Sequence, residues 1–120
     1  MRILVVEPDV DLRTRQAVAL SSAGHRVTAA ATFEAARQEL AVDRSDVIVT
    51  ALRLGAFNGL HLIIRARAVQ PHLAAVLTAA APDPALETEA RAHGAVFLPR
   101  ASDPAALVAI VGSLLIEPQR

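Results

Sequence analysis

The sequence predicts an α/β protein in which five parallel strands form a doubly wound sheet with helices on both faces. Short apolar runs alternate along the chain with longer amphipathic segments, which is the pattern of repeated βα units. Residues typical of helix starts separate the runs. The strands are expected to be parallel because each helix carries the chain back to the end of the sheet where the preceding strand began, so the next strand runs in the same direction.

The five strands are expected, in chain order, at Ile3–Val6, Arg26–Ala29, Val47–Thr50, Ala74–Leu77 and Val96–Leu98. Each run is too short or too continuously apolar to be a helix, so we expect these strands to be buried on both faces. The third strand is the centre of the sheet.

The helices between the strands begin at residues whose side chains can accept hydrogen bonds from the first helical turn. These residues are Thr32 before FEAARQEL and the aspartates of Asp83-Pro84 and Asp103-Pro104. The first helix is instead marked by Asp9 and Asp11, which place negative charge in its first turn after Pro8. A proline at the first helical position supports the last two starts. Gly24 and Gly94 are expected to end the first and fourth helices, because glycine accepts the left-handed backbone of a helix end.

Composition limits the classes of function. A chain of 120 residues fits a single domain over residues 1–120. Its 12 basic and 12 acidic side chains balance, so no electrostatic footprint for nucleic acid or anionic lipid is present. Without cysteine there is no disulfide and no thiolate nucleophile, and we expect a cytoplasmic protein. The opening MRILVVEPD is too short an apolar run for a signal peptide or membrane span.

In a sheet of this kind the binding site lies outside the carboxyl ends of the strands. The residues expected there are Glu7 and Pro8 after the first strand, Ala51 after the third, Thr78 after the fourth and Arg100 after the fifth. The turn after the first strand has no glycines to hold phosphate at a helix N-terminus. No nucleophile stands beside a base, and all four histidines lie away from the strand ends. We therefore expect no enzyme activity and no cofactor.

The whole chain, from Met1 to about Ile116, resembles the receiver domain of bacterial two-component response regulators. The resemblance rests on four motifs in the order and spacing of that family: ILVVEPDVDLR, DVIVTALRLGAFNGL, VLTA and HGAVFLPR. In the second motif the family has a strand, a phosphoryl-accepting Asp, a proline four residues on and a glycine eight residues on. Gly59 stands at plus eight and Gly55 replaces the proline, so the acceptor position is Ala51.

The resemblance implies the strand order 2-1-3-4-5 of the flavodoxin-like fold. It also implies a role for each matching position. In the family, an acidic pair and the acceptor Asp hold Mg²⁺, a Thr or Ser and a Lys bind the phosphoryl group, and an aromatic residue of the fifth strand changes rotamer. The residues at these positions are Glu7 and Pro8 for the acidic pair, Ala51 for the acceptor, Thr78 for the hydroxyl, Arg100 for the lysine and Phe97 for the switch-type aromatic.

Three of these positions have lost the chemistry of the family. A lone Glu7 beside Pro8 and Ala51 is a poor Mg²⁺ site, because Mg²⁺ needs several oxygen ligands with carboxylate charge. An alanine cannot accept a phosphoryl group. We therefore interpret the chain as a degenerate receiver, a pseudo-receiver in phosphorelay signalling that acts by phosphorylation-independent protein binding or dimerisation, without bound metal.

Two alternatives stay open. In the first alternative, the domain is a phosphorelay receiver with a non-standard acceptor such as Thr50, although that side chain should alternate away from the site. In the second alternative, the domain is a module that binds a small molecule in the vacated pocket.

The expected contact surface is the one the family uses: the fourth helix, fifth strand and fifth helix, which also offer a route to a homodimer. The segment ALVAIVGSLLI is apolar on more than one face, which singles out Val108, Val111, Leu115 and Ile116 as candidate interaction residues. Ordinary packing at the edge of the domain is the alternative. Phe97 either anchors a partner or fills space between the last two helices.

The last expectation concerns the emptied site itself. Arg100 is expected to reach Glu7 and form an ion pair, because a guanidinium fits a carboxylate and no acceptor Asp competes for it. The alternative is two separate, solvated side chains at the loop tips.

Overall fold

The computed structural model describes the backbone of residues 1–115 and the side chains of residues 1–114. Five parallel strands form the main sheet: β1 (Arg2–Val6), β2 (Arg26–Ala30), β3 (Val47–Ala51), β6 (Ala74–Thr78) and β7 (Ala95–Leu98). Their spatial order is β2-β1-β3-β6-β7, which is the order predicted for the five core strands. Each predicted strand is present and gains one residue at one end. The predicted fold class is therefore confirmed.

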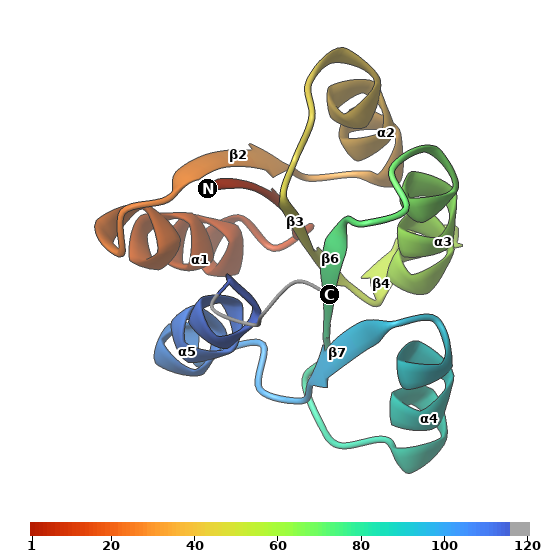
Figure 1. The fold of residues 1–120 in the computed structure, drawn as a ribbon. Helices are drawn as coiled ribbons and strands as arrows, with labels where there is room; N and C mark the ends of the chain where they lie inside the picture. The colour runs from red at the N-terminus through yellow and green to blue at the C-terminus, as the bar shows by residue number, and fades with distance from the viewer. Residues whose placement is uncertain (116–120) are drawn as a thin grey trace.

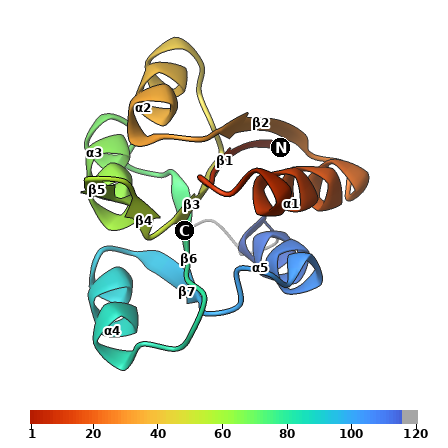
Figure 2. The ribbon, with the colours of Figure 1, turned by 180° about the vertical axis from the view of Figure 1, so that it is seen from behind.

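Five helices cover the sheet: α1 (Val10–Ser22), α2 (Phe33–Val42), α3 (Gly59–Val69), α4 (Pro84–Ala92) and α5 (Pro104–Leu115). Figure 1 shows α1 and α5 on one face of the sheet and α2, α3 and α4 on the other, and Figure 2 shows the same layers from behind. None of these helices is long and apolar enough to cross a membrane.

Each face of the sheet has its own hydrophobic core. Beneath α1 and α5, side chains of β1 and β3 pack against Leu20, Leu107 and Val111. On the other face, alternate residues of the same strands pack against α2, α3 and α4, with Ile63 at its centre. The strands β1, β3 and β6 are buried on both faces, as predicted, because both layers of helices lie over them.

The helix starts lie where the sequence predicts them. The side chains of Asp9, Thr32, Asp83 and Asp103 each accept a hydrogen bond from a backbone N–H three residues on, at 2.9–3.1 Å. Gly24 and Gly94 follow α1 and α4 with φ values of 97° and 75°, which is the left-handed backbone expected of them.

The structure corrects two expectations about the strands. The strand β2 lies at the edge of the sheet and is mostly exposed rather than buried on both faces, because only β1 pairs with it. A two-stranded hairpin, β4 (Arg53–Leu54) and β5 (Phe57–Asn58), follows β3 and is not among the five predicted strands. Gly55 at its turn has φ +66°, which a two-residue hairpin turn of this kind requires of its first position.

The expectation that Val108 and Val111 form part of an exposed apolar surface on α5 is wrong. Val111 is completely buried against the sheet, and Val108 is half-buried beside the same core. The side chain of Leu115 and all of Ile116 lie outside the described part of the chain. The edge-packing alternative therefore holds for the two valines, because one face of α5 must cover β1 and β3.

Candidate functional site

A cleft of about 380 Å³ lies outside the carboxyl ends of β1, β3 and β6. The residues that line it are Glu7, Pro8, Asp9, Leu12, Ala51, Leu52, Arg53, Thr78, Ala79, Ala80 and Ala101. Four of the five predicted site residues are therefore brought together in one place. The fifth, Arg100, does not line the cleft, and its neighbour Ala101 takes that place.

Backbone hydrogen bonds between neighbouring strand ends set the shape of the cleft. Ala51 is the register partner of Thr78, and the N–H of Leu52 donates to the carbonyl of Thr78 at 3.1 Å. The N–H of Glu7 donates to the carbonyl of Ala30 at 3.0 Å. The side chains at positions 7, 51 and 78 are thus held by rigid strand ends rather than by loops.

Glu7 is the one carboxylate buried in the cleft, with only 7% of its surface exposed. Its Oε2 accepts a hydrogen bond from the N–H of Asp9 at 3.0 Å. Burial raises the pKa of Glu7 above its ordinary value, and the negative charge of Asp9 adds to that rise. The hydrogen bond from the Asp9 backbone and the charge of Arg13 act in the opposite direction.

The predicted ion pair between Glu7 and Arg100 is wrong. No nitrogen of Arg100 lies within 4.0 Å of a Glu7 oxygen, and Arg100 is exposed. In the segment after β7, the residue held by hydrogen bonds is Ala101 rather than Arg100. The N–H of Ala101 donates to the carbonyl of Ala79 at 3.0 Å, and Gln16 Nε2 donates to the Ala101 carbonyl at 3.3 Å. The alternative of two solvated side chains holds for Arg100 but not for the buried Glu7.

The nearest guanidinium to the Glu7 backbone belongs to Arg13 on α1, and it is engaged elsewhere. Its Nη1 donates to the carbonyl oxygens of Glu7 at 2.8 Å and Pro8 at 3.3 Å. These bonds fix the turn between β1 and α1 but leave the Glu7 carboxylate without an ion pair among the described residues.

Sequence reasoning missed three residues that shape the site. Asp9 and Arg53 line the cleft, and buried Gln16 holds Ala101 against it. Asp9 could have been found, because it lies two residues after Glu7 at the same strand end. Gln16 could not, because its partner is 85 positions away in the sequence.

Both threonines at the strand ends are buried, with hydroxyls engaged in the protein. Thr50 Oγ1 donates to the carbonyl of Ala51 at 3.0 Å, and Thr50 does not line the cleft. Thr78 Oγ1 donates to the carbonyl of Thr50 at 3.4 Å. Thr50 therefore alternates away from the site, as its position on the strand predicts.

Phe97 is 9% exposed and belongs to the core on the side of α4. Of the two readings of this residue, filling space is the one that the packing supports. It does not stand out from β7 as an aromatic anchor.

The side chains of the cleft do not fit Mg²⁺. One oxygen of Glu7 is engaged by a backbone N–H, Asp9 caps α1 with its Oδ1, and Pro8 and Ala51 carry no side-chain oxygen. Within residues 1–115 no three His, Asp or Glu side chains gather as a metal site. These side chains are therefore a poor set of ligands for a divalent ion that requires near-octahedral oxygen coordination.

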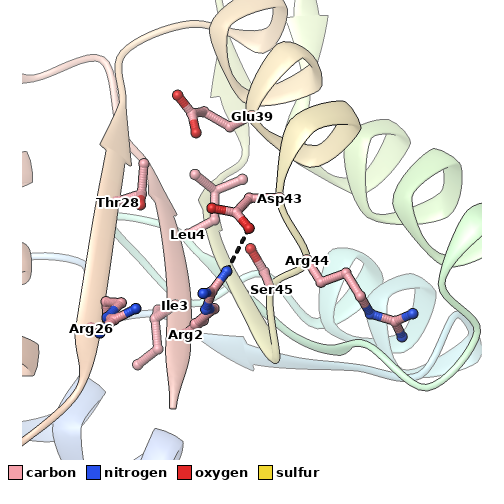
Figure 3. A pocket seen from close by; sticks show the side chains of 9 residues that line it. All are labelled: Arg2, Ile3, Leu4, Arg26, Thr28, Glu39, Asp43, Arg44 and Ser45. Carbon is pink, nitrogen blue, oxygen red and sulfur yellow. Dashed lines mark hydrogen bonds and ion pairs between the residues drawn. The ribbon is translucent and has the colours of Figure 1, made fainter.

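A second hollow lies at the opposite edge of the sheet, between β1, β2 and the end of α2 (Figure 3). There Arg2 pairs with Asp43, and the Arg2 N–H donates to Asp46 Oδ2 at 2.8 Å. Figure 3 shows Arg44 pointing away from this pair. With a volume of about 60 Å³ the hollow is small, and its groups hold the end of α2 to β1.

Replacing Glu7 with glutamine is expected to stabilise the domain at neutral pH and to have little effect in acid. The folded-state pKa of Glu7 lies above its ordinary value, so the stabilising contribution of this group is complete below the unfolded pKa and is lost as pH rises through the folded pKa. Glutamine keeps the acceptor for the Asp9 N–H without the charge. Urea unfolding of both proteins from about pH 4 to about pH 7 measures the difference. A stability difference that does not grow with pH would contradict the assignment.

Comparison with known proteins agrees with the fold and the motifs. The family model of the response regulator receiver domain matches residues 3–112. The non-phosphorylated HemR receiver domain from Leptospira biflexa superposes with a TM-score of 0.89 at 22% identity, covering 99% of this chain and 97% of that one. A two-component response regulator from Clostridium difficile gives 0.87 at 21% identity, with coverage of 96% and 95%. The chemotaxis protein CheY4 of Vibrio cholerae gives 0.85 at 21%, with coverage of 93% and 96%. A search of curated proteins finds no match.

Proposed function

The chain belongs to the response regulator receiver domain family, and we propose that it is a pseudo-receiver, which signals through protein contacts without being phosphorylated. One observation carries the proposal: Ala51 ends β3 at the acceptor position, inside the cleft. Its methyl group has no oxygen to attack a phosphoryl donor. The mismatch of the cleft with Mg²⁺ supports the same conclusion, since the metal would neutralise the transferred group.

The alternative acceptor Thr50 is disfavoured by its surroundings. It has no exposed surface, its hydroxyl is bonded to the carbonyl of Ala51, and it lies outside the cleft. A phosphoryl donor in the cleft would not reach it without movement of β3, which is the central strand of the sheet.

Acetyl phosphate with millimolar MgCl₂ is expected to add no stable phosphoryl group to the chain, and MgCl₂ alone should leave the melting temperature unchanged. Intact mass spectrometry and a thermal-shift measurement give the two readouts. A phosphorylated species that disappears in Thr50→Ala would contradict the proposal and identify the acceptor.

Restoring the lost side chains sharpens this test. Ala51→Asp supplies an acceptor but leaves Pro8 in the metal pair, so labelling should remain weak. The double variant Ala51→Asp, Pro8→Asp should label more efficiently and should gain a Mg²⁺-dependent rise in melting temperature. Equal labelling of the single and double variants would contradict the role assigned to Pro8.

We propose the face formed by α4, β7 and α5 as the contact surface for a protein partner. A shallow groove of about 430 Å³ lies there, lined by Glu87, Arg91 and the β7 edge. Among residues 1–114 the large hydrophobic side chains that are strongly exposed belong to other elements. The described part of this face therefore carries no large apolar side chain that is strongly exposed, which favours a different protein as the partner over a stable homodimer.

Sedimentation velocity at about 100 μM is expected to show a monomer, because an obligate dimer needs an extensive apolar contact and the described residues of this face expose no large apolar side chain strongly. A dimer that Arg91→Glu dissociates would contradict that expectation and assign the face to self-association.

A further inference from the structure

We propose that the cleft outside β1, β3 and β6 binds an organic cation, an alkylammonium or alkylguanidinium group, with Glu7 as its counterion. The inference extends the proposed function, because it names what the site takes in place of a metal and a phosphoryl group. It rests on that function only in requiring that the cleft be free.

The first observation is the unpaired state of Glu7. Glu7 as a whole residue is 7% exposed, lines the cleft, and has no cation within 4.0 Å among the described residues. One of its two oxygens accepts a hydrogen bond from the Asp9 N–H. Oε1 has no hydrogen-bond partner among the described residues, and it is accessible rather than closed off, because none of their side-chain oxygens is both fully buried and without a partner. Burying a carboxylate without a counterion is costly, so a cation that enters the cleft gains a pre-placed partner.

The second observation is the chemistry of the walls. Around the carboxylate stand the apolar side chains of Pro8, Leu12, Ala51, Leu52 and three further alanines. The volume of about 380 Å³ lies at the low end of the range for ligand pockets, roughly 300–1,000 Å³. A short alkyl chain that ends in a cation matches apolar walls with one deep carboxylate.

The other charged groups around the cleft are compatible with this ligand. Asp9 adds a second carboxylate at the exposed rim. The Arg13 guanidinium is held by the carbonyls of residues 7 and 8, and Arg53 is an exposed rim residue whose charge is screened by solvent. An ammonium group has three donors and a guanidinium five, and neither demands the octahedral set of oxygens that this cleft lacks.

Such a group has two sources, a lysine or arginine side chain of a partner protein and a free small amine. Their shared chemistry is tested by titrating ¹⁵N-labelled protein with butylammonium, with butylguanidinium and with 1-butanol as the uncharged analogue. N-acetyl-lysine N-methylamide, which carries the cation as a partner protein would, is the arm that separates the sources. The backbone amide signals of Asp9, Leu52, Ala79 and Ala101 report on the cleft.

We expect saturable shifts of these signals with the cations and at least about tenfold weaker binding of butanol. Glu7→Gln should weaken cation binding by a similar factor, whereas Glu89→Gln, an exposed carboxylate on α4, should not change it. Ala51→Leu, which fills the cleft without altering charge, should abolish the shifts. If the free cations bind and N-acetyl-lysine N-methylamide does not, the ligand is a free small molecule. If both bind, the cleft is wide enough for the lysine side chain of a partner protein.

The inference is overturned if no cation shifts these signals, if butanol binds as well as butylammonium, or if Glu7→Gln keeps the affinity of the native chain. Each of these results leaves the phosphorylation experiment unaffected, because intact mass reports on covalent transfer and the titration on reversible binding. Failure of one proposal is therefore distinguishable from failure of the other.

Discussion

Replacing Gly59 with alanine is expected to destabilise the domain by at least about 3 kcal/mol, because the new methyl group has no room. A Cβ at this position would lie 2.0 Å from the carbonyl oxygen of Ala51 and 2.8 Å from Thr50 Oγ1. Both neighbours belong to the central strand, and the N–H of Gly59 is tied to the Leu52 carbonyl at 2.7 Å. Relief therefore requires moving the start of α3 away from the sheet.

The matched control is Gly112→Ala in α5, where a Cβ would meet nothing within 4 Å. That change should stabilise the domain by roughly 0.5–1 kcal/mol, because alanine loses less backbone entropy in a helix than glycine. Thermal and urea unfolding of the two variants measures both effects. Equal stability of Gly59→Ala and the native protein would show that α3 does not pack as closely on β3 as the structure has it.

Replacing Val111 with aspartate is expected to cost more than about 4 kcal/mol and to leave little folded protein, because the charge has no partner there. Val111 has no exposed surface and packs with Leu20 and Leu107 between α5 and the sheet. Burial of an unpaired carboxylate is among the few single changes with effects of this size.

Ala109→Asp on the exposed side of the same helix is the control, and it should cost less than about 1 kcal/mol, mostly through helix propensity. Circular dichroism and urea unfolding distinguish the two variants. If Val111→Asp folded as well as Ala109→Asp, the valine would be a surface residue, as the sequence analysis expected, and the packing of α5 described above would be wrong.

The sequence by itself determined the five core strands, the helix starts and the identity of the residue at the acceptor position. Asp9 or Thr32 caps a helix through a hydrogen bond to a residue three positions away, so the signal and its partner lie in one short segment. The apolar runs fix the strands for the same local reason. The absence of an oxygen at Ala51 is a property of covalent structure, and no packing can restore it.

Only the tertiary structure decided which way the side chains of the site and of α5 face. Val111 and Ala109 stand on a helix with apolar residues around most of its circumference, so periodicity alone could not assign its buried face. Arg100 turns to solvent because Gln16, 85 positions from Ala101, helps to fix the segment that follows it. Glu7 is buried, without an ion pair among residues 1–114, for the same reason, since burial and counterions come from strands and loops that only folding brings together.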